Sequence, residues 1–298
     1  MLAGLSAPVP AVPARWLYDH RGSELFDEIT RLPSYYPTRT ETALLKHVMP
    51  ELAARIPDGM AVVEFGAGSA TKTPLLLEAI HPAAYVPVDI SGDYLHESAS
   101  EVAERFPQIS VEPVVADFAR EFDLPSSIAS LPKLGFFPGS TIGNFEHGEA
   151  VAFLRAARRL LRSGAQFVIG VDLVKDPAVL VSAYDDAQGV TAAFNKNLLA
   201  RINRELDGDF DLTAFAHRAI WNPDRNRIEM HLVSLKDQTA RAAGRSFQFA
   251  EGETIHTENS HKFTPDSFSR LAREAGWRTL KLWTSPEPAF AVFMLAAD

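Results

Sequence analysis

The residue pattern best suited to binding a ligand lies where an apolar segment ends. Gly66 and Gly68 follow the mostly apolar residues 62–65 and precede a helical pattern. Glycine lets the backbone turn sharply and approach a ligand closely, and the first N–H groups of a helix have no partner within the helix. The third glycine of a dinucleotide fingerprint is missing, because Thr71 stands there. A ligand with a pyrophosphate is therefore the less favoured occupant of this turn.

Acidic residues end the next two apolar segments. Asp89 stands where a carboxylate can accept hydrogen bonds from both hydroxyls of a ribose. Asp117 could accept a hydrogen bond from an adenine amino group, and Phe118 could cover the ring. Lys72 lies in the first helical turn after the glycines, where it faces either the ligand or solvent. The second acid favours S-adenosylmethionine over NAD as the cofactor.

These residues can bind one ligand only in a fold that brings the ends of neighbouring strands together. The pattern of the sequence predicts such a fold. From residue 60 to 174, short apolar runs alternate with helical patterns, which is typical of a parallel sheet covered on both faces. We therefore expect a doubly wound α/β domain. After Lys175 the alternation gives way to a long helical segment over 178–206 and then to period-two segments that predict hairpin strands. These segments are 215–222, 227–235 and 245–253, and a helix over 265–275 and a strand over 290–296 follow.

The first forty residues differ from a βαβ opening, because aromatic residues, prolines and charges are dense there. We expect one helix from Ser23, capped by that serine, to just before Pro33, and a second helix over about 39–56. The chain thus predicts two interleaved domains. An α+β domain combines 1–39 with 175–263, and the domain with the candidate S-adenosylmethionine site combines 40–174 with 264–298; the family resemblance given below implies that the α+β domain binds substrate.

Composition excludes several classes of protein. The 298 residues are 46% hydrophobic and 22% charged, which is ordinary for a folded globular chain. A net charge of −9 offers no positive field for nucleic acid or for an anionic membrane surface. Apolar runs stay far below the about 20 residues that cross a bilayer. The first fourteen residues lack Lys and Arg before Arg15 and contain prolines, unlike a signal peptide, so we expect a cytoplasmic protein.

The sequence shows no recognisable pattern of metal ligands. The chain has no cysteine, which excludes disulfides, thiolate metal sites and cysteine nucleophiles. His231, His256 and His261 lie among Glu229 and Glu258 without the spacings of helical metal ligands. We therefore expect no metal cofactor.

Long polar and aromatic strings cover nearly the whole chain from about Trp16 onward. They are residues 18–26, 32–41, 139–144, 170–176, 183–186, 189–195, 227–230 and 257–263. Together they resemble the histidine-specific Nα-methyltransferase family, whose members make hercynine, the first intermediate of ergothioneine biosynthesis. The resemblance implies a class I methyltransferase fold, S-adenosylmethionine as methyl donor and L-histidine as the small-molecule substrate. Ser34 departs from the family, which often has an acid there.

The resemblance also implies roles for single side chains. Tyr18 is the expected catalytic residue, beside the reacting amine, where its oxygen could accept a hydrogen bond or help to pass the released proton through water. Those expected to bind substrate are Tyr35, Asn144 and Tyr184 at the carboxylate, Glu258 and Ser260 at the imidazole, and Met230 as an apolar wall. A spacing of two on an extended segment puts both imidazole readers on one face. Those expected to bind cofactor are Gly66, Lys72, Asp89, Asp117, Phe118 and Gly139.

Methylation of an amine needs a neutral nitrogen aimed at the methyl group, so much of the catalysis consists of positioning the two groups.

Three other interpretations of the sequence remain open. The same scaffold could methylate another free amino acid such as tryptophan, although Glu258 and Met230 favour histidine. An NAD(P)-dependent oxidoreductase would use the glycine turn and Asp89 but leaves Asp117 and Phe118 unexplained. A silent binding module would bind ligands without releasing S-adenosylhomocysteine. We expect a monomer.

Overall fold

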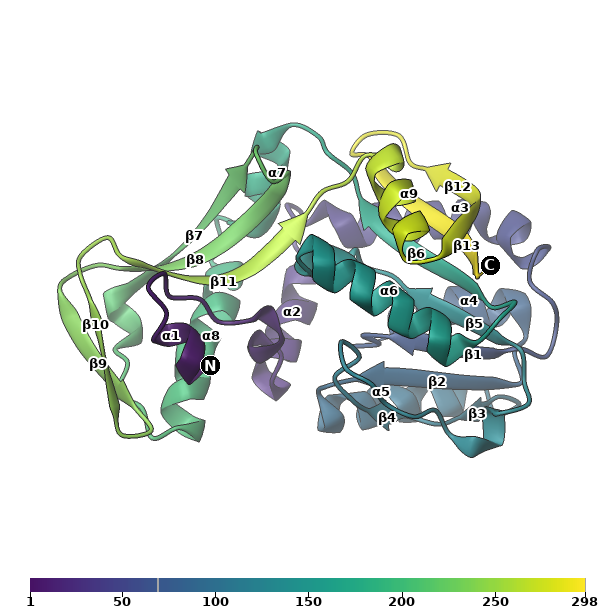
Figure 1. The fold of residues 1–298 in the computed structure, drawn as a ribbon, viewed down its shortest axis with the longest axis horizontal. Coiled ribbons are helices and arrows are strands. Elements are labelled where there is room, and N and C mark those ends of the chain that lie inside the picture. The colour runs from purple at the N-terminus through teal and green to yellow at the C-terminus, as the bar shows by residue number, and fades with distance from the viewer. Residues whose placement is uncertain (69, 298) are drawn as a thin grey trace. The chain divides into compact units, whose positions relative to one another are not determined.

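The computed structural model describes residues 1–68 and 70–297, and the chain forms two compact units. Unit 1 combines Met1–Tyr36 with Lys175–His261, and unit 2 combines Pro37–Val174 with Lys262–Asp298. The colours of Figure 1 show that each unit takes stretches from distant parts of the chain. The sequence placed the boundaries after residues 39, 174 and 263, and the structure divides the chain after residues 36, 174 and 261.

Unit 2 is built around a mixed sheet of eight strands in the order β12-β13-β6-β5-β1-β2-β3, with β4 also pairing with β2. Strand β13 runs antiparallel to β6 and β12, and the other pairs are parallel. The strands are β1 (Ala61–Phe65), β2 (Ala84–Asp89), β3 (Ser110–Val111), β4 (Val114–Val115), β5 (Lys133–Phe137), β6 (Gln166–Asp172), β12 (Trp277–Thr284) and β13 (Phe290–Ala297). Every residue of β1 and β5 is buried, as a sheet covered on both faces requires.

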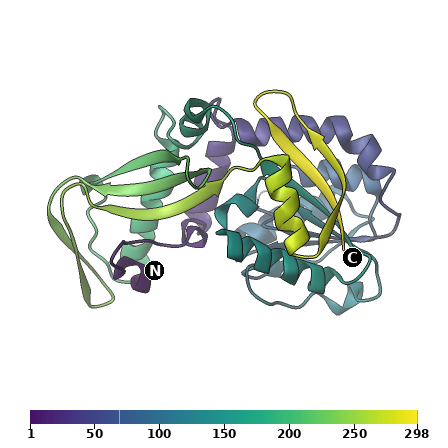
Figure 2. The ribbon, with the colours of Figure 1, turned by 45° about the horizontal axis from the view of Figure 1, so that its top comes forward.

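Helices cover both faces of this sheet, so the predicted doubly wound fold is confirmed (Figures 1 and 2). One apolar core joins α6 (His147–Leu161) and α9 (Pro265–Glu274) to the sheet. A second core joins α3 (Tyr36–Ala53), α4 (Thr73–Ile80) and α5 (Gly92–Arg105) to the opposite face. The loops after β1, β2 and β5 leave the sheet at its carboxyl edge, where doubly wound folds bind their ligands.

Unit 1 is an α+β unit, as predicted. Its antiparallel sheet has the order β11-β8-β7, and a separate hairpin joins β9 to β10. Its strands are β7 (Phe215–Asn222), β8 (Arg227–Ser234), β9 (Gln238–Ala242), β10 (Arg245–Phe249) and β11 (Thr254–His261). Its helices are α1 (Leu2–Leu5), the 3-10 turn η1 (Ala14–Leu17), α2 (His20–Thr30), α7 (Pro177–Tyr184), α8 (Val190–Glu205) and the 3-10 turn η4 (Leu212–Ala214). Apolar residues of α2, α8 and the sheet share one core.

Three local predictions are wrong. Asp19 caps α2 by accepting a hydrogen bond from the Gly22 N–H at 2.8 Å, whereas Ser23 is buried within the helix. The apolar segment that Asp117 ends is divided into β3 and β4, because Pro87 of β2 has no N–H to donate back where the Glu112 N–H donates to the Tyr85 carbonyl. The helical segment predicted over 178–206 is two helices, since the chain turns at Gly189 with a φ of +76°.

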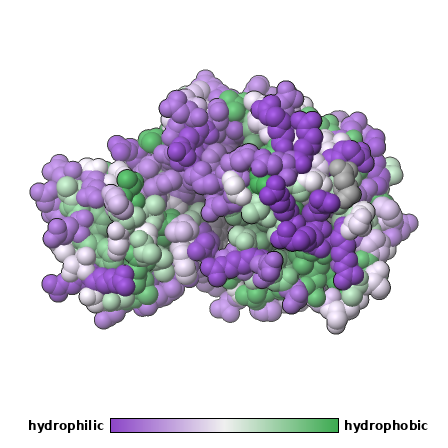
Figure 3. Space-filling model, viewed as in Figure 1, coloured by the Kyte–Doolittle hydropathy of each residue, from purple (hydrophilic) through white to green (hydrophobic). Residues whose placement is uncertain are grey.

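The surface shows polar and apolar residues mixed together. Figure 3 shows hydrophilic and hydrophobic residues interspersed over the visible face. In the described part of the chain, no helix has the length and apolar character needed to cross a membrane. Large exposed hydrophobic residues, such as Val9, Val115 and Leu235, lie in separate segments, which is normal for a folded protein. The groups that suggest function are therefore the buried polar ones.

Candidate active site

The turn after β1 holds the first predicted cofactor residues. Gly66 and Gly68 have φ values of +67° and +49°, which L side chains rarely adopt. Asp89, at the end of β2, accepts hydrogen bonds from the Gly68 N–H at 3.1 Å and from the Ser91 N–H at 3.0 Å. Burial raises the pKa of Asp89, although these backbone donors act in the opposite direction. Asp89 thus links the glycine turn to the neighbouring strand end, and its oxygens keep lone pairs for further donors.

The structure brings Phe118 to this turn. A Cβ atom on Gly66 would lie 3.3 Å from the Cε1 atom of Phe118, so the ring lies directly against the glycine. The ring also packs edge-on against Phe137, with centroids 5.6 Å apart. Asp117 accepts a hydrogen bond from the Ala119 N–H at 3.1 Å, and its side chain is 21% exposed. The acid and the ring therefore occupy the end of β4, beside the glycine turn.

Lys72 and Gly139 meet at a carboxylate that the sequence did not single out. The Nζ atom of Lys72 lies 2.5 Å from Oε2 of Glu41, and the Gly139 N–H donates to the same oxygen at 2.8 Å. The side chain of Glu41 is 1% exposed and that of Lys72 is 12% exposed. Lys72 is therefore not a solvated surface lysine. The sequence signal for Glu41 is its place at the end of the polar string 32–41, within an amphipathic helix.

A second buried acid, Glu64, lies in β1. The hydroxyls of Thr73 and Tyr85 donate to its Oε2 atom at 2.6 Å and 2.7 Å. Burial raises the pKa of Glu64 to about 7, against the opposing effect of these two donors and of Lys72. Near neutral pH this carboxyl is therefore partly ionised. Together with Glu41 and Asp89, it gives unit 2 an excess of acidic groups around the glycine turn, which suits a cationic ligand.

Asn144 is placed by the loop that follows β5. It ends the 3-10 helix η3 (Thr141–Asn144) and is half-buried. The loop is fixed at Ser140, which has a φ of +58° and whose hydroxyl accepts a hydrogen bond from the Asp172 N–H at 2.9 Å. Asp172 in turn forms a fully buried ion pair with Lys262, with Oδ2 and Nζ 2.9 Å apart. Asn144 belongs to unit 2, whereas the other predicted substrate residues belong to unit 1.

In unit 1, edge-to-face ring contacts connect the predicted tyrosines. The ring centroids are 5.6 Å apart for Tyr18 and Phe26, 6.1 Å for Phe26 and Tyr35, and 6.0 Å for Tyr35 and Tyr184. Tyr35 and Tyr184 are buried, and Tyr18 is partly buried. The structure thus gathers residues from α2, its flanking segments and α7 into one aromatic cluster.

A β-bulge positions the predicted imidazole readers. The register between β11 and β8 shifts between His256 and Glu258, so Thr257 is the additional residue. The Thr257 hydroxyl donates to the Met230 carbonyl at 3.0 Å. Beyond the bulge, Glu258 lies opposite Met230, and Ser260 follows two residues later. Glu258 and Ser260 therefore lie on one face of the sheet, as their spacing predicts.

Hydrogen bonds connect this strand to the aromatic cluster. The hydroxyls of Tyr184 and Ser260 lie 2.7 Å apart, and both side chains are buried. The Tyr184 carbonyl accepts a hydrogen bond from Nε2 of His217 at 2.8 Å, while Nδ1 of that ring lies 2.9 Å from the Asn195 amide nitrogen. Burial lowers the pKa of His217, which favours the neutral ring that this arrangement needs. The sequence assigned no role to His217 or Asn195.

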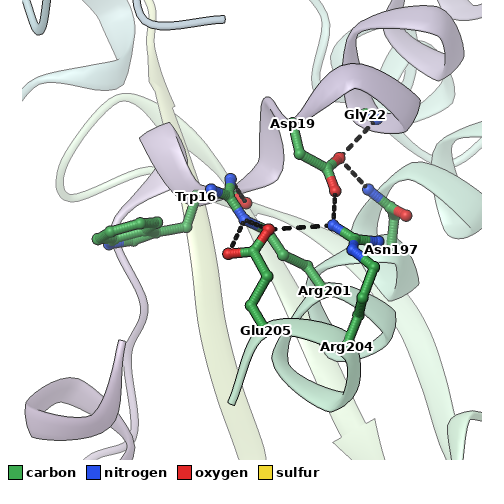
Figure 4. Close-up of polar contacts among 7 residues, drawn as sticks. All are labelled: Trp16, Asp19, Gly22, Asn197, Arg201, Arg204 and Glu205. Carbon is green, nitrogen blue, oxygen red and sulfur yellow. Dashed lines mark hydrogen bonds and ion pairs between the residues drawn. The ribbon is translucent and has the colours of Figure 1, made fainter. Parts of the chain in front are cut away.

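The backbone position of Tyr18 is fixed by hydrogen bonds of the next residue, Asp19. Figure 4 shows the Asp19 carboxylate accepting from the Gly22 N–H, from the Asn197 amide at 2.7 Å and from Arg204 at 2.5 Å. Burial alone would raise the pKa of Asp19, but these hydrogen bonds outweigh it and lower the pKa. The charged acid therefore fastens the segment before α2 to α8.

Residues 1–297 match the family described as histidine-specific methyltransferase, SAM-dependent. The chain belongs to this family. It is 41% identical to the histidine N-alpha-methyltransferase of Mycolicibacterium smegmatis, over 97% of this chain and 91% of that protein. It is 38% identical to the enzyme of the same description from Mycobacterium tuberculosis, over 99% of this chain and 92% of that protein.

Comparison with a solved structure also indicates a methyltransferase fold. An S-adenosylmethionine-dependent methyltransferase from Clostridium acetobutylicum superposes with a TM-score of 0.51 at 10% identity, covering 93% of this chain and 98% of that chain. At this identity the likeness concerns the fold alone. The family match identifies the chain as an S-adenosylmethionine-dependent methyltransferase.

Proposed function

We propose that the chain transfers methyl groups from S-adenosylmethionine to the α-amine of L-histidine, three times, and so makes hercynine for ergothioneine biosynthesis. The observation that carries this proposal is the placement of Glu258 and Ser260 on one face of β11, with Met230 opposite Glu258. A carboxylate and a hydroxyl can bind the two ring nitrogens of an imidazole, while the thioether packs against the ring. An indole, with one N–H, would leave part of this polar pair unused.

Unit 2 supplies the groups for the methyl donor. Bound there, S-adenosylmethionine supplies an electrophilic methyl group on a sulfonium cation. We assign the ribose hydroxyls to Asp89 and the adenine amino group to Asp117, with Phe118 over the adenine ring. Lys72 stays paired with Glu41 and offers its remaining N–H donors to the carboxylate of the cofactor. Gly66 and Gly139 allow its close approach.

The amino acid substrate is held by neutral donors. In unit 1, Tyr35 and Tyr184 donate hydrogen bonds to its carboxylate, which fixes the direction of the α-amine. In unit 2, the Asn144 amide is a further neutral donor for such a group. An α-amine has a pKa of about 8, so a useful fraction is neutral near pH 7.5 without a strong base. The Tyr18 hydroxyl accepts a hydrogen bond from this amine and passes the released proton to water. The faces of the tyrosine rings stabilise the cationic product as methyl groups accumulate.

The test is a methyl-transfer assay in which each free amino acid is offered separately with S-adenosylmethionine and the products are identified by mass spectrometry. We expect mono-, di- and trimethylated histidine and little product from other amino acids. Robust methylation of tryptophan with none of histidine would overturn the proposal. Release of no S-adenosylhomocysteine with any amino acid would favour a silent binding module.

We further propose that the enzyme acts as a monomer in the cytoplasm. The net charge of −9, which offers nothing to attract an anionic membrane surface, supports this proposal. Light scattering at assay concentration measures the oligomeric state, and a mass near 32.7 kDa is the expected result.

A further inference from the structure

A cluster of histidine and glutamate side chains lies outside the predicted substrate site. Glu229 and His231 alternate along β8, so both point to the face opposite Met230. His256 on β11 lies directly opposite His231, and the two rings stack with centroids 4.9 Å apart. One donor atom from each of Glu229, His231 and His256 lies within 4.8 Å of the others. Two residues at i and i+2 and one cross-strand residue therefore converge from one face of the sheet.

The carboxylate of this cluster is already oriented. Its Oε1 atom accepts hydrogen bonds from Arg227 Nε at 2.7 Å and from the Asn222 amide at 2.9 Å. Its Oε2 atom points to His231, 3.3 Å from Nε2. Metal-binding carboxylates are commonly held in this way, one oxygen fixed by neighbouring donors and the other facing the ion.

The imidazoles can supply lone pairs. The Nδ1 atom of His231 is buried and has no hydrogen-bond partner among the residues that the structure describes. His256 points its Nε2 atom at the Glu258 carbonyl, 3.1 Å away, and a proton on that atom leaves the lone pair of this ring on Nδ1. Two imidazoles and a carboxylate match the preferences of zinc and its neighbours in the first transition series.

Nearby positive charge restricts which ion fits. Arg227 contacts Glu229, and Arg218 lies opposite His231 in the register of β7 with β8. These guanidinium groups offset the charge of the carboxylate, so attraction by charge alone is weak. Hard ions such as Ca²⁺ and Mg²⁺, which depend on several oxygen ligands, are disfavoured. The affinity must come from donation by imidazole nitrogen.

We propose that Glu229, His231 and His256 bind one divalent transition-metal ion on the face of the β8–β11 ladder opposite Met230 and Glu258. The site takes no part in methyl transfer as derived above. The helical spacings sought in the sequence could not find it, because antiparallel pairing brings together residues that are about two dozen positions apart, and His261 is not among the converging groups.

The test is a Co²⁺ titration of the full chain after treatment with a chelator, without histidine, since free histidine itself binds such ions. We expect visible d–d absorption that saturates at one Co²⁺ per chain and is displaced by Zn²⁺. His231→Gln, His256→Gln and Glu229→Gln should each weaken Co²⁺ binding by at least about tenfold, and Asn222→Ala, which loosens the carboxylate, by about tenfold.

His20→Gln is the matched control, because His20 is exposed and lies 3.7 Å from Glu24, a surface pair of the same chemistry. This variant should bind Co²⁺ as the wild-type chain does. Wild-type protein that binds no Co²⁺, or binding that survives in all three ligand variants, would overturn the proposal. Loss of binding in His20→Gln would equally reject it. Far-UV circular dichroism checks folding first, and any two ligand variants that fold decide the outcome.

Discussion

The two units position their predicted site residues by different means. In unit 2 the groups are mostly strand ends and turn glycines: Gly66, Gly68, Asp89 and Gly139 all lie where the topology of a parallel sheet requires loops. In unit 1 the groups are side chains from distant segments, brought together by aromatic packing and by the bulge at Thr257. The first kind of site depends on backbone geometry and buried charge, and the second on the register of one strand pair.

The strongest test of the backbone-dependent part is Gly170→Ala in β6. A Cβ atom there would lie 1.9 Å from Oε1 of Glu41, within the buried group that joins Lys72 and Gly139. We expect the free energy of unfolding to fall by about 3 kcal/mol, because the carboxylate must move away from its partners. Urea unfolding measures this loss, and calorimetry with S-adenosylhomocysteine should show weaker binding.

Gly148→Ala is the control for that change. Gly148 lies in α6, and a Cβ there meets none of the described atoms within 4 Å. Alanine favours helix by about 1 kcal/mol over glycine, so this variant should be as stable as the wild type or slightly more stable. If both variants unfolded at the same urea concentration, the claim that close packing of Gly170 against Glu41 stabilises unit 2 would be contradicted.

Buried charge in unit 2 predicts a pH dependence. The pKa of Glu64 is about 7 in the folded chain and 4.5 when exposed. The folded state therefore binds the proton more tightly, and the stability that Glu64 contributes is complete below about pH 4.5 and is lost as pH rises through about 7. Over this range the wild type should lose about 3 kcal/mol relative to Glu64→Gln.

The measurement is the free energy of unfolding of both proteins at several values of pH between 4.5 and 8. Glutamine keeps an oxygen for the Thr73 and Tyr85 hydroxyls but does not titrate. Parallel stability curves for wild type and variant would contradict the account of Glu64.

The smallest expected effect belongs to the register-dependent part. Thr257→Val removes the hydrogen bond to the Met230 carbonyl, which is worth about 1 kcal/mol. Because the bulge aims Glu258, we expect the KM for histidine to rise about fivefold, while the KM for S-adenosylmethionine stays unchanged. Thr257→Ser, which keeps the hydroxyl, should restore the KM for histidine. Equal changes in both constants would indicate a general loss of structure instead.

The same contrast explains what the sequence could predict. Unbroken apolar runs and turn glycines predicted the parallel sheet, its helices and the strand-end acids, since each depends on local pattern. Glu41 was missed, because its partners Lys72 and Gly139 come from other segments and its burial depends on Gly170. Strands β9 and β12 were also missed, because charged residues interrupt their apolar pattern.

In unit 1 the candidate site residues were predicted through the family resemblance. The sequence pattern predicted very little of how these residues are arranged. The spacing of Glu258 and Ser260 indicated that they share a face. No local pattern marks the bulge that decides which face of the sheet this is. The contact of Tyr184 with Ser260 joins residues on α7 and β11, and the network around Asp19 joins α2 to α8. Such contacts follow from packing between distant segments, which periodicity does not contain.

The most direct test of the central claim, that unit 1 reads the amino acid and unit 2 holds the methyl donor, is calorimetry on Glu258→Gln. The account predicts that the affinity for histidine, measured with S-adenosylhomocysteine present, falls by about 30-fold, since a charged hydrogen bond worth about 2 kcal/mol is lost. The affinity for S-adenosylhomocysteine alone should not change. Unchanged histidine binding in this variant, with the protein folded, would contradict the account.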